Sequence, residues 1–145
     1  MYFVDREQIE TTLQFLETQI EFFESRVFWE TPLEKAAFER LAHTMIEAVL
    51  DVGNAMIDGF IMRDPGSYED IIDILDDEKV ITAEMSEGLK KIVQFRKMLV
   101  QQYTAVDHVG LKESFAAELP QLKLFSGKVR EYLTNELGPV SAFKK

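Results

Sequence analysis

Cysteine is absent from all 145 residues, and histidine occurs only twice, as His43 and His108. The lack of cysteine excludes disulfide bonds and thiolate metal sites. The scarcity of histidine argues against a histidine-rich metal centre. We therefore expect neither a metal nor a cofactor.

Long apolar segments are missing as well. No run approaches the ~20 apolar residues that a helix needs to cross a bilayer. The first ten residues, MYFVDREQIE, lack the charged start and long apolar region of a signal peptide. The expectation is a cytoplasmic protein with no membrane contact.

The remaining composition is that of a globular chain. Hydrophobic residues make up 46% of it and charged residues 29%, which argues against disorder. A chain of 145 residues is long enough to bury a sizeable core. We expect one domain over residues 1–145.

Charge is distributed unevenly along the chain. The formal net charge of −10 would repel nucleic acid if it were spread uniformly. Residues 69–87 contain eight acidic residues and one base, whereas residues 88–104 contain no acid and four bases, which are Lys90, Lys91, Arg96 and Lys97. One explanation is the matching of side-chain charges to helix dipoles. The alternative is a small anion-binding surface.

Apolar residues recur at helical spacing from the N-terminus onward. The first segment has a seam in which they are separated by three or four residues: Ile9, Leu13, Leu16, Ile20, Phe23 and Val27. Phe15 and Phe22 widen this seam, so that one neighbouring helix is too narrow to cover it.

A second helix is predicted to begin at TPLE, where Thr31 suits the N-cap, Pro32 the first turn and Glu34 a capping box. Its predicted apolar side consists of Phe38, Leu41, Met45, Ala48, Val49, Val52 and Met56. Its polar side falls within about 80° on a helical wheel and consists of Arg40, His43, Glu47, Asp51, Asn54 and Asp58. This polar stripe is either a solvated face or a cleft facing another helix or chain.

The second half of the chain predicts three more helical segments. Ser67 can cap a short helix, a long helix extends from Met85 through Tyr103, and a last one covers residues 111–137. Pro120 should kink or divide the last helix. We predict an all-α antiparallel bundle of about four to five helices, with enough surplus apolar surface for a two-fold dimer.

Residues 96–103, RKMLVQQY, resemble the signature of HepT-like proteins, the HEPN-type ribonuclease toxins. That signature is an arginine, four residues, a histidine, one residue and a tyrosine. The upstream segment ERLAHTMIEAVLDVGNAMI is similar to the second helix of the family, and the resemblance covers nearly the whole chain. It implies a dimer with the motif at its junction, metal-independent RNA cleavage, and a minimal nucleotidyltransferase as antitoxin partner.

Carried over to this sequence, the resemblance makes Arg96, Gln101 and Tyr103 the candidate catalytic residues. Arg96 would hold the scissile phosphate, and Tyr103 would assist or be modified during neutralisation. Gln101 stands where the family has histidine, and Lys97 where it often has asparagine. An imidazole exchanges protons near neutral pH, whereas an amide only donates and accepts hydrogen bonds. Loss of one general acid-base group removes ~10²–10⁴ in rate.

Further residues are predicted around this motif. Lys90, Lys91 and Lys97 would support anion binding, and Glu47 or Asp51 would be the carboxylate nearest to Arg96. On a straight helix, Arg96 and Tyr103 lie within ~20° of each other, whereas Gln101 lies ~140° from Arg96. Convergence of the three would then need a second helix or chain.

Three functions remain open from the sequence. The first is a dimeric HepT-like module with a degenerate motif that binds RNA or a partner. The second is an active ribonuclease toxin that uses a displaced histidine. The third is a purely structural helical dimer, in which Tyr103 extends the apolar stripe of Ile92, Phe95 and Leu99, and Arg96 merely pairs with a carboxylate.

Overall fold

The computed structural model describes residues 2–138, which form six helices and no strand. The helices are α1 (Arg6–Glu24), α2 (Pro32–Gly59), α3 (Tyr68–Asp77), α4 (Ala83–Val93), α5 (Arg96–Gln101) and α6 (His108–Leu137). The predicted all-α class is confirmed. The number of helices exceeds the prediction because the expected fourth helix is divided in two.

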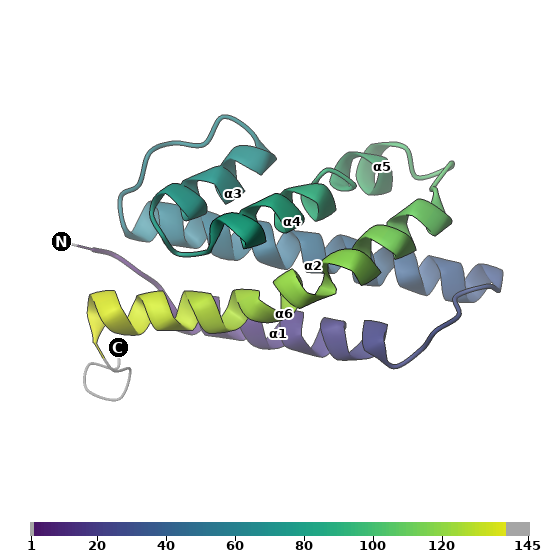
Figure 1. Ribbon diagram of the computed structural model, residues 1–145, viewed down its shortest axis with the longest axis horizontal. Helices are drawn as coiled ribbons and strands as arrows, with labels where there is room; N and C mark the ends of the chain where they lie inside the picture. The colour runs from purple at the N-terminus through teal and green to yellow at the C-terminus, as the bar shows by residue number, and fades with distance from the viewer. Residues whose placement is uncertain (1, 139–145) are drawn as a thin grey trace.

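The long helix α2 is the centre of the bundle and packs against α1, α3, α5 and α6. Figure 1 shows α1 on one side of α2, and α3, α4 and α5 on the other. The first half of α6 crosses towards α4, with which it packs, and its second half lies along α1. Within the described residues, no helix is long and apolar enough to cross a membrane.

The predicted helix starts follow from side-chain capping. The Thr31 hydroxyl accepts a hydrogen bond from the Glu34 backbone N–H, and the Glu34 carboxylate accepts one from the Thr31 N–H, which completes the capping box of α2. Ser67 caps α3 in the predicted way. Such a cap stabilises a helix by ~1 kcal/mol and is formed by residues close together in the sequence. The starts of α2 and α3 could therefore be predicted from the sequence.

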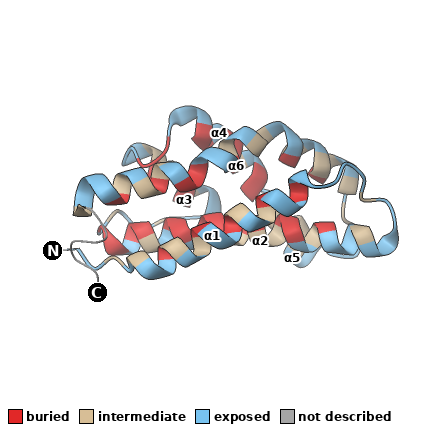
Figure 2. Cartoon of the chain, turned by 90° about the horizontal axis from the view of Figure 1, so that it is seen from below, coloured by how far each residue is buried: buried red, intermediate tan, exposed pale blue. Residues whose placement is uncertain are grey.

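The buried core follows the apolar seams of the sequence (Figure 2). Every residue of the predicted apolar side of α2 is buried, and so are five of the six residues in the first seam. Val27 is the exception, at 68% exposed, because α1 ends at Glu24. Phe15 and Phe22 project from α1 and are 45% and 51% exposed. The wide face predicted for the first helix is therefore only partly covered by its own chain.

The prediction of one long helix from Met85 through Tyr103 is wrong. A turn at Gln94 and Phe95 separates α4 from α5, and α5 ends at Gln101. The Phe95 N–H donates to the Ile92 carbonyl, three residues back, instead of continuing the α-helical pattern. Because neither proline nor glycine occurs at this turn, the sequence carries no local signal for it.

Pro120 lies in the middle of α6 and does not divide it. Figure 1 shows that α6 instead bends about halfway along its length. A proline removes one helical hydrogen bond and kinks the axis, which is the milder of the two predicted outcomes. The bend lets one helix pack against α4 in its first half and against α1 in its second.

Candidate functional site

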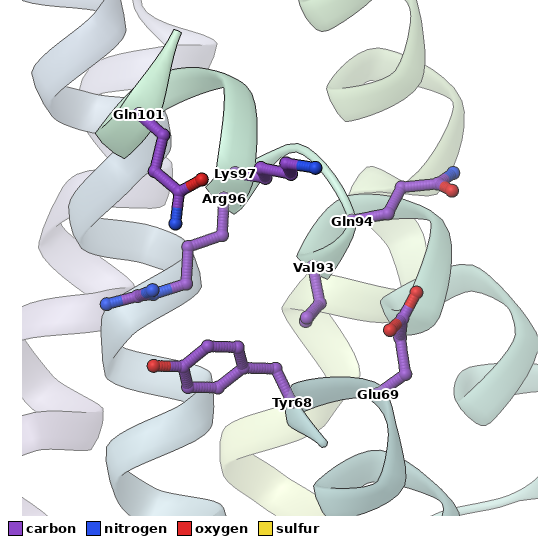
Figure 3. A pocket seen from close by; sticks show the side chains of 7 residues that line it. All are labelled: Tyr68, Glu69, Val93, Gln94, Arg96, Lys97 and Gln101. Atoms are coloured by element: carbon purple, nitrogen blue, oxygen red, sulfur yellow. The ribbon is translucent and has the colours of Figure 1, made fainter. Parts of the chain in front are cut away.

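The start of α5 borders a cavity of about 480 Å³ between α3, α4 and α5 (Figure 3). Its lining residues are Tyr68, Glu69, Val93, Gln94, Arg96, Lys97 and Gln101. Three of these residues, Arg96, Lys97 and Gln101, belong to the motif singled out from the sequence. The turn between α4 and α5 is what places them at the cavity rather than along one continuous helix.

Arg96 is held by contacts from two other helices. Its Nε donates to Glu47 Oε2 at 2.6 Å, and its Nη2 donates to Glu47 Oε1 at 3.4 Å. The Glu47 carboxylate of α2 therefore binds one edge of the guanidinium. Its Cζ lies 4.3 Å from the centre of the Tyr68 ring of α3. The hydrogen bond to Glu47 raises the pKa of Arg96. The predicted carboxylate partner is thus confirmed as Glu47.

The electrostatic surroundings of Arg96 are not strongly positive. Desolvation and the neighbouring Glu47 carboxylate raise the pKa of Asp51, and the charge of Arg96 opposes that rise. Glu69 is the carboxylate that lines the cavity, where Lys97 is the second cation. Glu47 and Asp51 of α2 add negative charge next to Arg96, which limits attraction for a polyanion.

Gln101 and Arg96 line the same cavity, although a helical wheel separates them. Arg96 is the first residue of the short α5 and Gln101 is the last. Figure 3 shows the Gln101 side chain pointing back along α5 towards Arg96. The expectation was that Arg96, Gln101 and Tyr103 would need a neighbouring helix or a second chain to converge. Arg96 and Gln101 line one cavity together with residues of α3 and α4, whereas Tyr103 does not line it.

Tyr103 lies beyond the C-cap of α5 and outside the cavity lining. Its side chain is 67% exposed. The alternative of a core tyrosine in the stripe of Phe95 and Leu99 is therefore wrong, since the chain leaves the helix before reaching Tyr103. It is accessible from solvent, but it does not share the cavity with Arg96.

Lys90 and Lys91 do not reach this cavity either. Lys90 donates to Asp73 at 2.7 Å, and Lys91 lies 3.9 Å from Glu118. Both belong to the last turn of α4, where cations suit the helix dipole. The structure thus matches the dipole explanation for these two lysines, and it leaves Lys97 beside Arg96.

The two histidines lie next to carboxylates of α2. His43 Nε2 is 3.9 Å from Glu47 Oε2, the same oxygen that accepts from Arg96. His108, at the start of α6, is 2.6 Å from Glu39. Among the described residues, no group of histidine and carboxylate side chains has the arrangement of a metal site.

The polar stripe of α2 faces α5 only in its middle. His43 and Glu47 are half-buried there, whereas Arg40, Asp51, Asn54 and Asp58 are exposed. The stripe therefore faces another helix in its middle, and it is a solvated face elsewhere. Glu47 serves the site, and the ends of the stripe are solvated.

Sequence reasoning missed Tyr68, Glu69 and Gln94. Tyr68 is the first residue of α3, directly after its cap, and it reads as an ordinary helix start. Its contact with Arg96 joins residues from different helices, and no spacing in the sequence signals it. The pairing depends on how α3 and α5 pack on α2.

This arrangement can bind an anion but offers little for proton transfer. The guanidinium retains Nη1 and part of Nη2 for a phosphate oxygen, since Glu47 uses only the Nε edge. Gln101 can donate and accept hydrogen bonds, but its amide cannot act as a general acid or base near neutral pH. The cavity is thus suited to holding a phosphate-bearing ligand.

Known proteins are similar to this chain in sequence and in fold. Residues 7–129 match the family described as Ribonuclease HepT-like. The chain is 52% identical over 144 residues to a protein of Bacillus subtilis (strain 168) that carries the provisional name RNase YutE, with 99% of this chain and 100% of the relative covered. The solved structure of YutE from Bacillus subtilis, described as a cytosolic protein of unknown function, has a TM-score of 0.95 and 52% identity, with 99% of this chain and 100% of that chain covered. These findings confirm the predicted family and fold: the chain belongs to the HepT-like ribonuclease family.

Proposed function

We propose that this chain is a HEPN-type ribonuclease-like protein that binds RNA through Arg96 and cleaves it weakly or not at all. The observation that carries the proposal is that Arg96 and Gln101 line the same cavity. The arginine can hold a phosphate, and the group opposite it cannot move a proton. The motif is therefore degenerate at the position that performs acid-base chemistry.

The proposal predicts weak, salt-sensitive RNA binding that depends on Arg96. The Arg96→Ala variant should bind a labelled single-stranded RNA roughly tenfold more weakly, because a charge-assisted hydrogen bond is lost. The slope of log affinity against log salt should become shallower by about 0.7, the contribution of one single-strand phosphate contact. Fluorescence anisotropy between 50 and 300 mM salt measures both quantities.

Lys128→Ala is the matched control, since it also removes one positive charge. Lys128 lies on α6 in a 3.7 Å surface pair with Glu131, away from the cavity. It should leave the affinity and the salt slope unchanged. RNA binding that responds equally to both variants would mean that only net charge matters, and would remove Arg96 from the role proposed.

One observation favours an active ribonuclease as the second candidate. His43 lies 3.9 Å from the Glu47 carboxylate that holds Arg96, so an imidazole is present near the phosphate-binding residue. An imidazole at that place could replace the missing motif histidine as a general base. RNA cleavage by the wild type that disappears in His43→Ala would establish this candidate.

A homodimer is also part of the proposal. Phe15 and Phe22, one above the other on α1, leave an aromatic surface that a second copy could cover. Sedimentation velocity at micromolar concentration should give twice the 16.7 kDa mass of the chain. A species with the mass of one chain would contradict the dimer. A dimer that bound neither RNA nor another protein would correspond to the purely structural alternative.

A minimal nucleotidyltransferase is the partner that we propose in a toxin-antitoxin pair. The exposure of Tyr103, 67% in the loop after α5, supports access by a modifying enzyme. Co-purification of such an enzyme, with a nucleotide-sized mass increase that Tyr103→Phe abolishes, tests the pairing. We also propose a cytoplasmic location, supported by the description of YutE as cytosolic.

A further inference from the structure

The cavity beside Arg96 has more room than a phosphate group alone requires. Its volume of about 480 Å³ lies within the range of ~300–1,000 Å³ that small-molecule sites occupy. An aromatic ring, an aliphatic side chain and an amide line it together with the cations: Tyr68, Val93 and Gln101. These groups suit the planar, hydrogen-bonding part of a nucleotide rather than its phosphate.

Tyr68 supplies a surface for stacking. Its ring lies under the Arg96 guanidinium, with 4.3 Å between Cζ and the ring centre, and the residue still keeps 48% of its surface exposed. In Figure 3, Val93 points towards the same ring from α4. Unpaired bases stack on aromatic rings and on guanidinium planes in single-strand binding proteins. The guanidinium covers one face of the Tyr68 ring, so a base would stack on the surface of Tyr68 that stays exposed.

Gln101 supplies hydrogen bonds on the opposite side. Its amide points towards Arg96 and the cavity from the end of α5 (Figure 3). An amide both donates and accepts, which matches the mixed donors and acceptors on the edges of nucleobases. A glutamine at this position is therefore suited to recognising a base, although it cannot transfer a proton.

We infer that this cavity is a nucleobase subsite for one unit of single-stranded RNA. The phosphate binds Arg96, the base packs against Tyr68 and Val93, and the Gln101 amide contacts the base edge. This inference rests on the proposed binding of an RNA phosphate by Arg96. A base inside a duplex is stacked and paired, so only an unpaired base can enter.

The test compares two labelled oligomers of equal length, poly-adenylate and its abasic analogue, which carry the same number of phosphates. Fluorescence anisotropy with the full chain should show that the adenylate oligomer binds at least about fivefold more tightly, the lower range for one stacked base. The Tyr68→Leu variant should lose this preference and bind the adenylate oligomer as weakly as the abasic one. Its affinity for the abasic oligomer should be that of the wild type, because the two hydrogen bonds to Glu47 still hold Arg96.

Two further variants separate this inference from the proposed function. Arg96→Ala should weaken binding of both oligomers, and Phe3→Ala, which removes an aromatic side chain that is 78% exposed before α1, should affect neither. Equal affinity of the wild type for both oligomers, with dependence on Arg96 retained, overturns the base subsite and leaves phosphate binding in place. Equal weakening of both by Tyr68→Leu also overturns it, because Tyr68 would then only position Arg96. Binding of neither oligomer by the wild type overturns both proposals.

Discussion

The Gln101→His variant should cleave RNA about 10²- to 10⁴-fold faster than the wild type, the range that one general acid-base group contributes. The imidazole would enter the cavity that Arg96 already lines, on the side chain that points towards Arg96. Its pKa near neutrality allows it to take a proton from the ribose 2′-hydroxyl, which the amide cannot do. The measurement is the initial rate of cleavage of a generic RNA without divalent metal.

Gln102→His is the matched control for this gain. Gln102 is the next residue, it is exposed, and it does not line the cavity. It should leave the rate at the wild-type level. Adding Arg96→Ala to Gln101→His should abolish the gain, because the phosphate would no longer be held. An equal gain from both histidine variants would show that an imidazole anywhere near the motif suffices, and would contradict the role assigned to position 101.

The Phe115→Ala variant should lower the free energy of unfolding by about 3–5 kcal/mol, the range for removing a fully buried phenylalanine. Phe115 is 0% exposed, and its ring centre lies 6.2 Å from that of Phe23. It thereby joins α6 to α1, and the truncation leaves a cavity between them. Urea or thermal unfolding followed by circular dichroism measures the loss.

Phe22→Ala provides the comparison, since it removes the same ring from a site that is 51% exposed. In a monomer its effect should stay within about 0.5 kcal/mol. A loss comparable to that of Phe115→Ala would show that Phe22 is buried in the assembled protein. That outcome would support the homodimer proposed through α1, and a loss within about 0.5 kcal/mol would contradict a dimer through this face.

The sequence was sufficient to predict the features that depend on neighbouring residues, which are the helix caps and the apolar periodicity. The capping box of Thr31 and Glu34 and the Ser67 cap gave the starts of α2 and α3, because these hydrogen bonds lie within four residues. The apolar seams of α1 and α2 gave the core, since burial follows helical periodicity. A carboxylate partner for Arg96 was also predictable, as a partly buried guanidinium needs one. The sequence left Glu47 and Asp51 as alternatives, and the structure shows Glu47.

The turn at Gln94 and Phe95 was not predictable in this way. Glutamine, phenylalanine and arginine all tolerate a helix, and the break becomes favourable only through packing against the bundle. Phe95 packs against the core, and Arg96 is fixed by residues 49 and 28 positions earlier in the chain, Glu47 and Tyr68. The same turn brings Gln101 to the cavity and takes Tyr103 away from it. The helical wheel predicts the opposite arrangement, with Tyr103 beside Arg96 and Gln101 away from it.

Arg96 is proposed to hold RNA in a cavity without a proton-transfer group. The most direct test is the metal-free cleavage of a generic RNA by the wild type beside Arg96→Ala, with RNA binding recorded in the same samples. We expect binding that depends on Arg96 and cleavage that is absent or very weak in both proteins. Robust cleavage by the wild type that Arg96→Ala removes would contradict this proposal and identify an active ribonuclease.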